Sequence, residues 1–242
     1  MRKYMIFFIS TLILIVGCSK ESGKKSTLSE ELPSQKTSEF SQGEQHFKVI
    51  PLYEEVIDYT EVIIKNSDQP ENEIYDDKVI QPFRQQLTEG NLNLKMDISQ
   101  YLIPTRYAQD LNDYSVDLLN RQDEINNLIE KALSDSSKLL SGGDKTVFVM
   151  SANPEMPLED MNGVAAWTLS DNVILIQMNP EFTNRQLTYT VAHEYHHTVT
   201  MEKSSVGGTF LDFVIFEGKA DSFAKIVYPK QTYNGLKQFL MM

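Results

Sequence analysis

The stretch that decides the fold is VAHEYHHTV, residues 191–199. It holds three of the chain's four histidines, His193, His196 and His197, and one carboxylate, Glu194. Residues four apart in a helix are nearly superposed, so His193 and His197 share one edge, with Glu194 beside them. A zinc hydrolase helix needs two neutral imidazoles as ligands and a carboxylate that accepts a proton. The pattern His-Glu-x-x-His therefore predicts a metal site on a helix. His196 lies about 100° around the helix from His197 and is interpreted as a bystander.

The residues before this motif predict β-strands. KTVFVMS (145–151) is a β-branched and aromatic run of strand length, and VAAWTL (164–169) followed by VILIQM (173–178) predicts a hairpin. The order of strands, motif helix and a further helix favours an α+β fold, with a small antiparallel-containing sheet before the motif. We expect an extended peptide to pair with Val173–Met178 as an exposed edge strand.

Apolar residues at helical spacing predict the remaining elements. Asn184 or Thr183 is placed to cap the motif helix, and a final helix is expected from about 210 to 227. Upstream, the pattern predicts a helical region over three ranges: 53–64, 71–89 with an interruption at Pro82, and 111–133 as one long helix or a pair.

Catalytic zinc takes three protein ligands and leaves one position open, so a third ligand must come from outside the motif. No histidine follows His197, which excludes a third histidine downstream. Glu217 lies twenty residues after His197 within IFEGKADSFA, and Asp221 follows one helical turn later. Here the sequence resembles the gluzincin metallopeptidases, the thermolysin-like clan. The resemblance implies that His193, His197 and Glu217 bind one Zn²⁺ ion, and that Asp221 hydrogen-bonds the other ring nitrogen of His193.

AHEYHH followed by EGKADSFA, over about the last hundred residues, also resembles the YjaZ-like predicted zinc-dependent proteases. The resemblance implies a zincin-like metallopeptidase that acts on a peptide or protein substrate, with Glu194 accepting a proton from the attacking water and giving it to the leaving amine. Thermolysin-like enzymes also carry a downstream histidine or tyrosine that stabilises the oxyanion. The sequence ends twenty-one residues after Asp221, leaving Tyr228 and Tyr233 as candidates. Either a tyrosine serves, or a C-terminal part is missing.

The N-terminus predicts a lipid anchor. Arg2 and Lys3 precede an apolar run, and Ile15, Val16 and Gly17 lead to Cys18, the only cysteine, in a pattern that resembles the bacterial lipobox. We therefore expect a lipoprotein signal peptide over 1–18, lipidation of Cys18, and a location on the extracytoplasmic face of the cell membrane. A polar, Ser- and Lys-rich segment predicts a flexible linker over 19–46, and the metallopeptidase domain follows as a helical part (47–141) and a catalytic part (142–242).

Charge and composition limit the partners. The chain has 22 basic and 34 acidic residues, a formal net charge of -12, which repels phosphates and excludes a nucleic-acid footprint. The leading hypothesis is a membrane-anchored zinc metallopeptidase. Two alternatives stay open: a surface lipoprotein that binds zinc without catalysis, and a metal-dependent hydrolase of a non-peptide envelope substrate. Two imidazoles and a carboxylate also accept other divalent metals.

Overall fold

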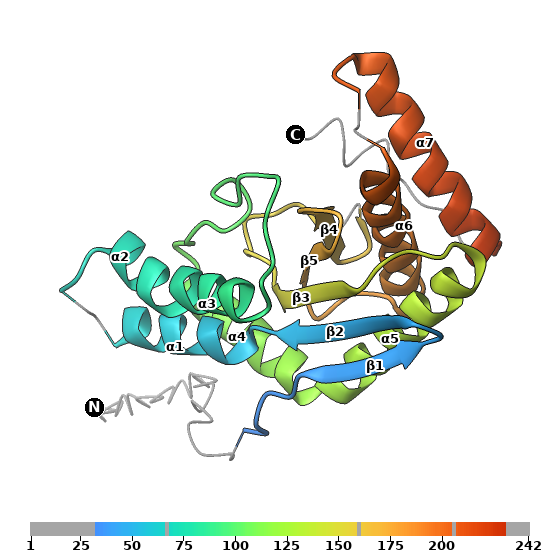
Figure 1. Cartoon of the computed structure of the whole chain (residues 1–242). Coiled ribbons are helices and arrows are strands. Elements are labelled where there is room, and N and C mark those ends of the chain that lie inside the picture. Colours follow the sequence, from blue (N-terminus) through green and yellow to red (C-terminus); the bar gives the residue numbers. More distant parts are fainter. Residues whose placement is uncertain (1–31, 66–67, 159–160, 205–206, 231–242) are drawn as a thin grey trace, which may run out of the picture. The chain divides into compact units, whose positions relative to one another are not determined.

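The computed structural model describes residues 32–65, 68–158, 161–204 and 207–230. The predicted signal peptide with Cys18, and the candidate Tyr233, lie outside these residues. The described part has an α+β fold built on a mixed five-stranded sheet (Figure 1). Within it, no helix has the length and apolar character needed to cross a bilayer.

The elements follow one another in the order that the sequence predicts, with two additional short strands before the first predicted helix. They are β1 (Ser38–Gln42), β2 (Gln45–Pro51), α1 (Tyr53–Ile64), α2 (Glu71–Tyr75), the π-helical turn η1 (Asp76–Ile80), α3 (Gln81–Glu89), α4 (Ala108–Asn120), α5 (Gln122–Leu139), β3 (Lys145–Ser151), β4 (Val164–Thr168), β5 (Val173–Met178), α6 (Asn184–Lys203) and α7 (Phe210–Val227).

The sheet has the strand order β1-β2-β3-β5-β4. β4 and β5 pair antiparallel, as the predicted hairpin requires, while β3 pairs parallel with both β2 and β5. The prediction that Val173–Met178 is an exposed edge was wrong, because β5 lies between β3 and β4 and all its residues are buried. Its uninterrupted apolar run is typical of a strand covered on both faces, and the edge strand is β4.

The predicted flexible linker 19–46 ends earlier than expected. Residues 38–42 form β1, which pairs antiparallel with β2 at the opposite edge of the sheet. The ring of Phe40 stacks on its register partner Phe47 with a centroid separation of 4.8 Å. The polar composition around Phe40 suggested disorder, but pairing with β2, the Phe40–Phe47 contact and hydrogen bonds that join Lys36, Ser38 and Gln42 to α5 hold this segment in place.

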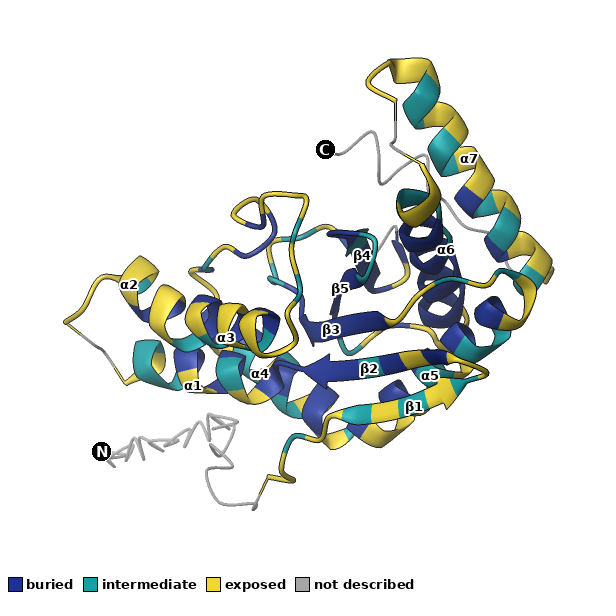
Figure 2. Cartoon of the chain, in the orientation of Figure 1, coloured by how far each residue is buried: buried dark blue, intermediate teal, exposed yellow. Residues whose placement is uncertain are grey.

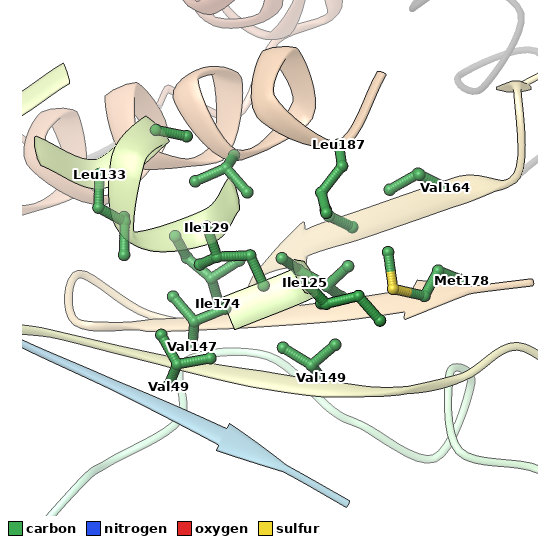
Figure 3. Packing of buried hydrophobic residues seen from close by; sticks show 14 of the residues in the cluster. Val49, Ile125, Ile129, Leu133, Val147, Val149, Val164, Ile174, Met178 and Leu187 are labelled. Carbon is green, nitrogen blue, oxygen red and sulfur yellow. The ribbon is translucent and has the colours of Figure 1, made fainter. Parts of the chain in front are cut away.

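Both faces of the sheet carry helices (Figures 1 and 2). α5 and α6 pack on one face through branched apolar side chains, whose interdigitation Figure 3 shows: Val49, Val147, Val149 and Ile174 of the strands meet Ile125, Ile129 and Leu133 of α5 and Leu187 of α6. The other face packs against α1, η1 and α3 through a second cluster that includes Phe148, Leu175, Val56, Val79 and Phe83. The motif helix is therefore anchored directly on the main core.

The helical predictions hold with refined boundaries. Range 111–133 is a pair of helices, α4 and α5, separated at Arg121. Range 71–89 is interrupted by the π-helical turn η1, and α3 begins at Gln81 with Pro82 in its first turn, where its missing N–H costs nothing. Thr183 is the N-cap of α6, since its hydroxyl accepts a hydrogen bond from the Gln186 N–H.

Candidate metal centre

The motif helix α6 is fixed in orientation by its core-facing side. The Tyr195 hydroxyl is buried and donates to the Leu140 carbonyl at 2.6 Å, and it lies 3.0 Å from the Gln45 amide oxygen. This side chain ties α6 to the end of α5 and to β2. Because Tyr195 sits between the motif residues in sequence, anchoring it inward turns the ligand edge of the helix away from the core.

Two helices bring three donor groups together. His193 and His197 extend from α6 and Glu217 from α7, and one donor atom from each lies within 4.8 Å of the others. The two Nε2 atoms are 3.0 Å apart, and the Glu217 carboxylate lies 3.2 Å from His193 Nε2 and 3.4 Å from His197 Nε2. Both histidines are buried and Glu217 is partly exposed. The three predicted ligands thus converge on one point.

This arrangement fits a zinc ion. Tetrahedral zinc with bonds of about 2.0–2.1 Å places its ligand atoms roughly 3.3 Å apart. The two Nε2 atoms are 3.0 Å apart, His193 Nε2 lies 3.2 Å from Oε2 of Glu217, and His197 Nε2 lies 3.4 Å from Oε1 of the same carboxylate. Two ring nitrogens and a carboxylate oxygen are also the donor set of a catalytic zinc site that keeps one position open.

The charges of these groups are strongly coupled in the metal-free protein. Burial lowers the pKa of His197 to about 4, which keeps this imidazole neutral. Burial also opposes a charge on His193, but the hydrogen bond that His193 donates to Glu217 and the charge of the nearby Glu194 raise its pKa overall. Burial likewise opposes ionisation of Glu217, yet the two histidines lower the pKa of its carboxyl to about 2. Glu217 is therefore a carboxylate at any ordinary pH, as a metal ligand must be.

Glu194 contacts the end of β4. Its carboxylate is buried and accepts a hydrogen bond of 2.8 Å from the Thr168 hydroxyl at the end of edge strand β4. Burial raises the pKa of Glu194 to about 7. A carboxyl group with a pKa near neutrality is suited to accept and then return a proton, because both protonation states are accessible.

Asp221 lies one turn after Glu217, as predicted, but its recorded contacts differ from the expected one. Its carboxylate accepts a hydrogen bond of 2.6 Å from the Tyr189 hydroxyl of α6 and another from Lys225. Its negative charge contributes to the raised pKa of His193. Asp221 therefore links the two ligand helices and acts on His193 through its charge.

Of the two tyrosine candidates, only Tyr228 lies among the described residues, and its recognised contacts are with α5 rather than with the metal ligands. The Tyr228 hydroxyl lies 3.3 Å from the Asp135 carboxylate of α5, and Lys131 lies over its ring. Tyr228 directly follows α7 and lies against α5. This position does not support its predicted role as the oxyanion donor. His196 is half-buried beside Phe223, and burial lowers its pKa to about 4. His196 is not part of the donor cluster of His193, His197 and Glu217, and its interpretation as a bystander stays a prediction.

Three neighbours of the site were not predicted from the sequence. Thr168 holds Glu194, Tyr189 holds Asp221, and the Phe216 ring stacks on the His197 ring at 4.0 Å. The presence of Phe216 near the site could have been predicted from the sequence, because it directly precedes the candidate ligand Glu217. Thr168 carried no signal, since its role depends on how the hairpin lies against α6.

Comparison with known proteins supports the motif assignment. Residues 125–238 match the family described as "Predicted Zn-dependent protease (DUF2268)", which confirms the resemblance to YjaZ-like predicted zinc proteases. Neither curated proteins nor solved structures give a match to the chain.

Proposed function

Because the catalytic part of the chain matches a family of predicted zinc-dependent proteases, we propose that this protein is a zincin-like metallopeptidase that hydrolyses peptide bonds. The observation that carries the proposal is the convergence of His193, His197 and Glu217 at spacings suited to zinc, with Glu194 buried beside them. A structural site has no need of a buried carboxyl group beside its ligands, whereas hydrolysis does.

His193, His197 and Glu217 would hold the ion, which when bound supplies Lewis-acid polarisation of the scissile carbonyl and of water. Glu194 takes the proton of the attacking water and returns it to the leaving amine. Thr168 positions the carboxylate of Glu194 by its hydrogen bond and, because it donates, favours the ionised form that acts first. Phe216 covers one face of His197 and limits access of bulk water to that ligand.

We also propose that the domain is tethered to the outer face of the cell membrane through lipidated Cys18. The lipobox-like sequence Ile15 to Cys18 supports this, since it places the only cysteine of the chain at the position that is modified. Cys18→Ser should move the protein from the membrane fraction to the soluble fraction and prevent lipid labelling. A protein that remains membrane-bound after this change would contradict the proposal.

The test of the enzymatic proposal pairs metal content with cleavage. The purified protein should bind one zinc ion and cleave members of a peptide library, while Glu194→Gln should bind zinc equally and lose about 10²- to 10⁴-fold in rate, the usual contribution of general acid–base catalysis. Glu202→Gln is a matched control: its carboxylate pairs with Lys145 at the far end of α6. Zinc in both proteins with cleavage by neither would instead establish the non-catalytic zinc-binding lipoprotein, and cleavage of cell-wall material alone would identify a non-peptide substrate.

A further inference from the structure

The two ligand helices, α6 and α7, lie side by side and are joined by two polar pairs one turn apart (Figure 1). His193 of α6 meets Glu217 of α7 at 3.2 Å. One turn earlier on α6, the Tyr189 hydroxyl donates a hydrogen bond of 2.6 Å to Oδ1 of Asp221, which lies one turn later on α7. Because residues four apart share one face of a helix, both pairs belong to one antiparallel interface. The ligand pair and the Tyr189–Asp221 pair are therefore in the same register.

The Tyr189–Asp221 pair is held on both of its sides. Tyr189 is 1% exposed, and its ring packs with Ala192 and Ala224 between the two helices. Its hydroxyl also lies 3.2 Å from the backbone carbonyl of Asp221. The other carboxylate oxygen of Asp221 accepts a hydrogen bond of 2.6 Å from Lys225 on its own helix. Donors from α6 and from α7 thus fix the orientation of this carboxylate.

The register of α7 against α6 matters because it decides where Glu217 lies. The only fully buried residues of α7 are Ala220 and Ala224, and such small side chains interlock little with a facing helix. A shift of α7 by one residue along its axis would move Glu217 by about 1.5 Å, whereas metal–ligand distances tolerate only about 0.2 Å. A hydrogen bond depends strongly on distance and angle, so the one at Asp221 opposes this shift.

We propose that Tyr189 is a positioning residue of the metal centre: its hydrogen bond to Asp221 sets the register of α7 and holds Glu217 in place before the ion binds. This inference rests on the proposed metallopeptidase function and deepens it, since it names a residue that determines how tightly the site holds its ion. A ligand that is already in place loses less conformational freedom on binding, and the affinity for the ion is higher for that reason.

Calorimetric titration of the metal-free full chain with zinc tests this role. Tyr189→Phe keeps the ring and removes the hydroxyl, and it should bind zinc about 10- to 100-fold more weakly, the usual effect of losing a partner behind a metal ligand. Tyr59→Phe is the matched control. Tyr59 is also buried, its hydroxyl donates a hydrogen bond of 2.7 Å to Glu71, and it lies in the cluster on the other face of the sheet. It should lose comparable stability and keep the wild-type zinc affinity.

A double-mutant cycle shows whether Tyr189 acts through Asp221. Asp221→Ala alone should weaken zinc binding, and adding Tyr189→Phe to it should weaken binding little further, because the hydroxyl has then already lost its acceptor. Full additivity of the two losses would overturn this route, as would equal losses of zinc affinity in Tyr189→Phe and Tyr59→Phe.

Peptide cleavage by the same zinc-loaded proteins separates this inference from the proposed function. If wild type cleaves peptides and Tyr189→Phe binds zinc as tightly as wild type, the positioning role is wrong while the peptidase function stands. If Tyr189→Phe binds zinc more weakly than wild type but neither protein cleaves peptides, the function fails and the positioning role stands. Absence of zinc binding by wild type overturns both.

Discussion

The two ligand helices differ in how the fold holds them. On α6, both histidines and Glu194 are buried, and the helix packs on α5 and β4. On α7, only Ala220 and Ala224 are fully buried, although its sequence is strongly apolar. Two of the candidate metal ligands are therefore positioned by the core, while the third comes from a helix whose two fully buried residues are alanines. Local stability differs accordingly, because regions with few buried contacts open at lower free energy. Metal binding should matter most for α7.

The largest expected effect is that of zinc on the difference in local stability between α6 and α7. In the metal-free protein, the backbone amides of α7 should exchange hydrogen faster than those of α6. Zinc at one hundred times its Kd should slow exchange in α7 by up to about 100-fold, equivalent to about 2.7 kcal/mol. Hydrogen exchange followed by mass spectrometry measures both helices together. Glu217→Ala should lose this protection in α7; equal protection of the two helices before zinc is added would contradict the comparison.

Removal of the hydrogen bond to Glu194 on α6 should impair this residue as the proposed proton acceptor. Thr168→Val removes the hydroxyl that donates to Glu194 and leaves a buried carboxylate without this partner. We expect a loss of about 1–3 kcal/mol in unfolding free energy, together with lower kcat and unchanged zinc content. Thr198→Val is the control, because this buried hydroxyl donates to the Tyr195 carbonyl within its own helix. Chemical denaturation and peptide cleavage report the two effects; equal kcat for both variants would exclude a role for Thr168.

Overpacking the contact between α7 and α6 tests whether small buried residues hold α7 in place. Ala224→Leu inserts atoms between α7 and α6, where Ala224 packs with Tyr189 and Ala192. It should destabilise the protein by about 1–3 kcal/mol and weaken zinc binding, because Glu217 moves with its helix. Ala132→Leu overpacks α5 in the main core and should destabilise similarly without weakening zinc binding. Calorimetric titration with zinc separates the two variants, and equal affinities would show that α7 does not depend on this contact.

The two glutamates provide the finest test, since burial raises the pKa of Glu194 to about 7 and the histidines, against burial, lower that of Glu217 to about 2. A raised pKa means that stability is lost as pH increases from about 4.5 through 7, so Glu194→Gln should raise the melting temperature of the metal-free protein at pH 8 and change it little at pH 4.5. A lowered pKa means that stability is present above about 4.5 and lost as pH falls towards 2. Glu217→Gln should therefore lower the melting temperature at pH 8, with an effect that shrinks on acidification. Shifts of the same sign in both variants at pH 8 would contradict this assignment.

The element order and the metal ligands could be predicted because their signals are local. Helical spacing alone aligns His193 with His197. Glu217 was assigned as the third candidate ligand through the resemblance to the gluzincin metallopeptidases. The strands before the motif were recognisable by composition. Their arrangement was not, since the same apolar run VILIQM suits either an edge or a central strand, and only pairing with β3 and β4 placed it inside the sheet.

The sequence by itself determined an α+β chain with a His-Glu-x-x-His helix and a glutamate helix after it, because these depend on the spacing of residues along one element. Only the tertiary structure decided that Thr168 meets Glu194, that Tyr189 meets Asp221, and that Tyr228 turns to Asp135. Each of these contacts joins residues far apart in sequence, and its geometry follows from how whole elements pack.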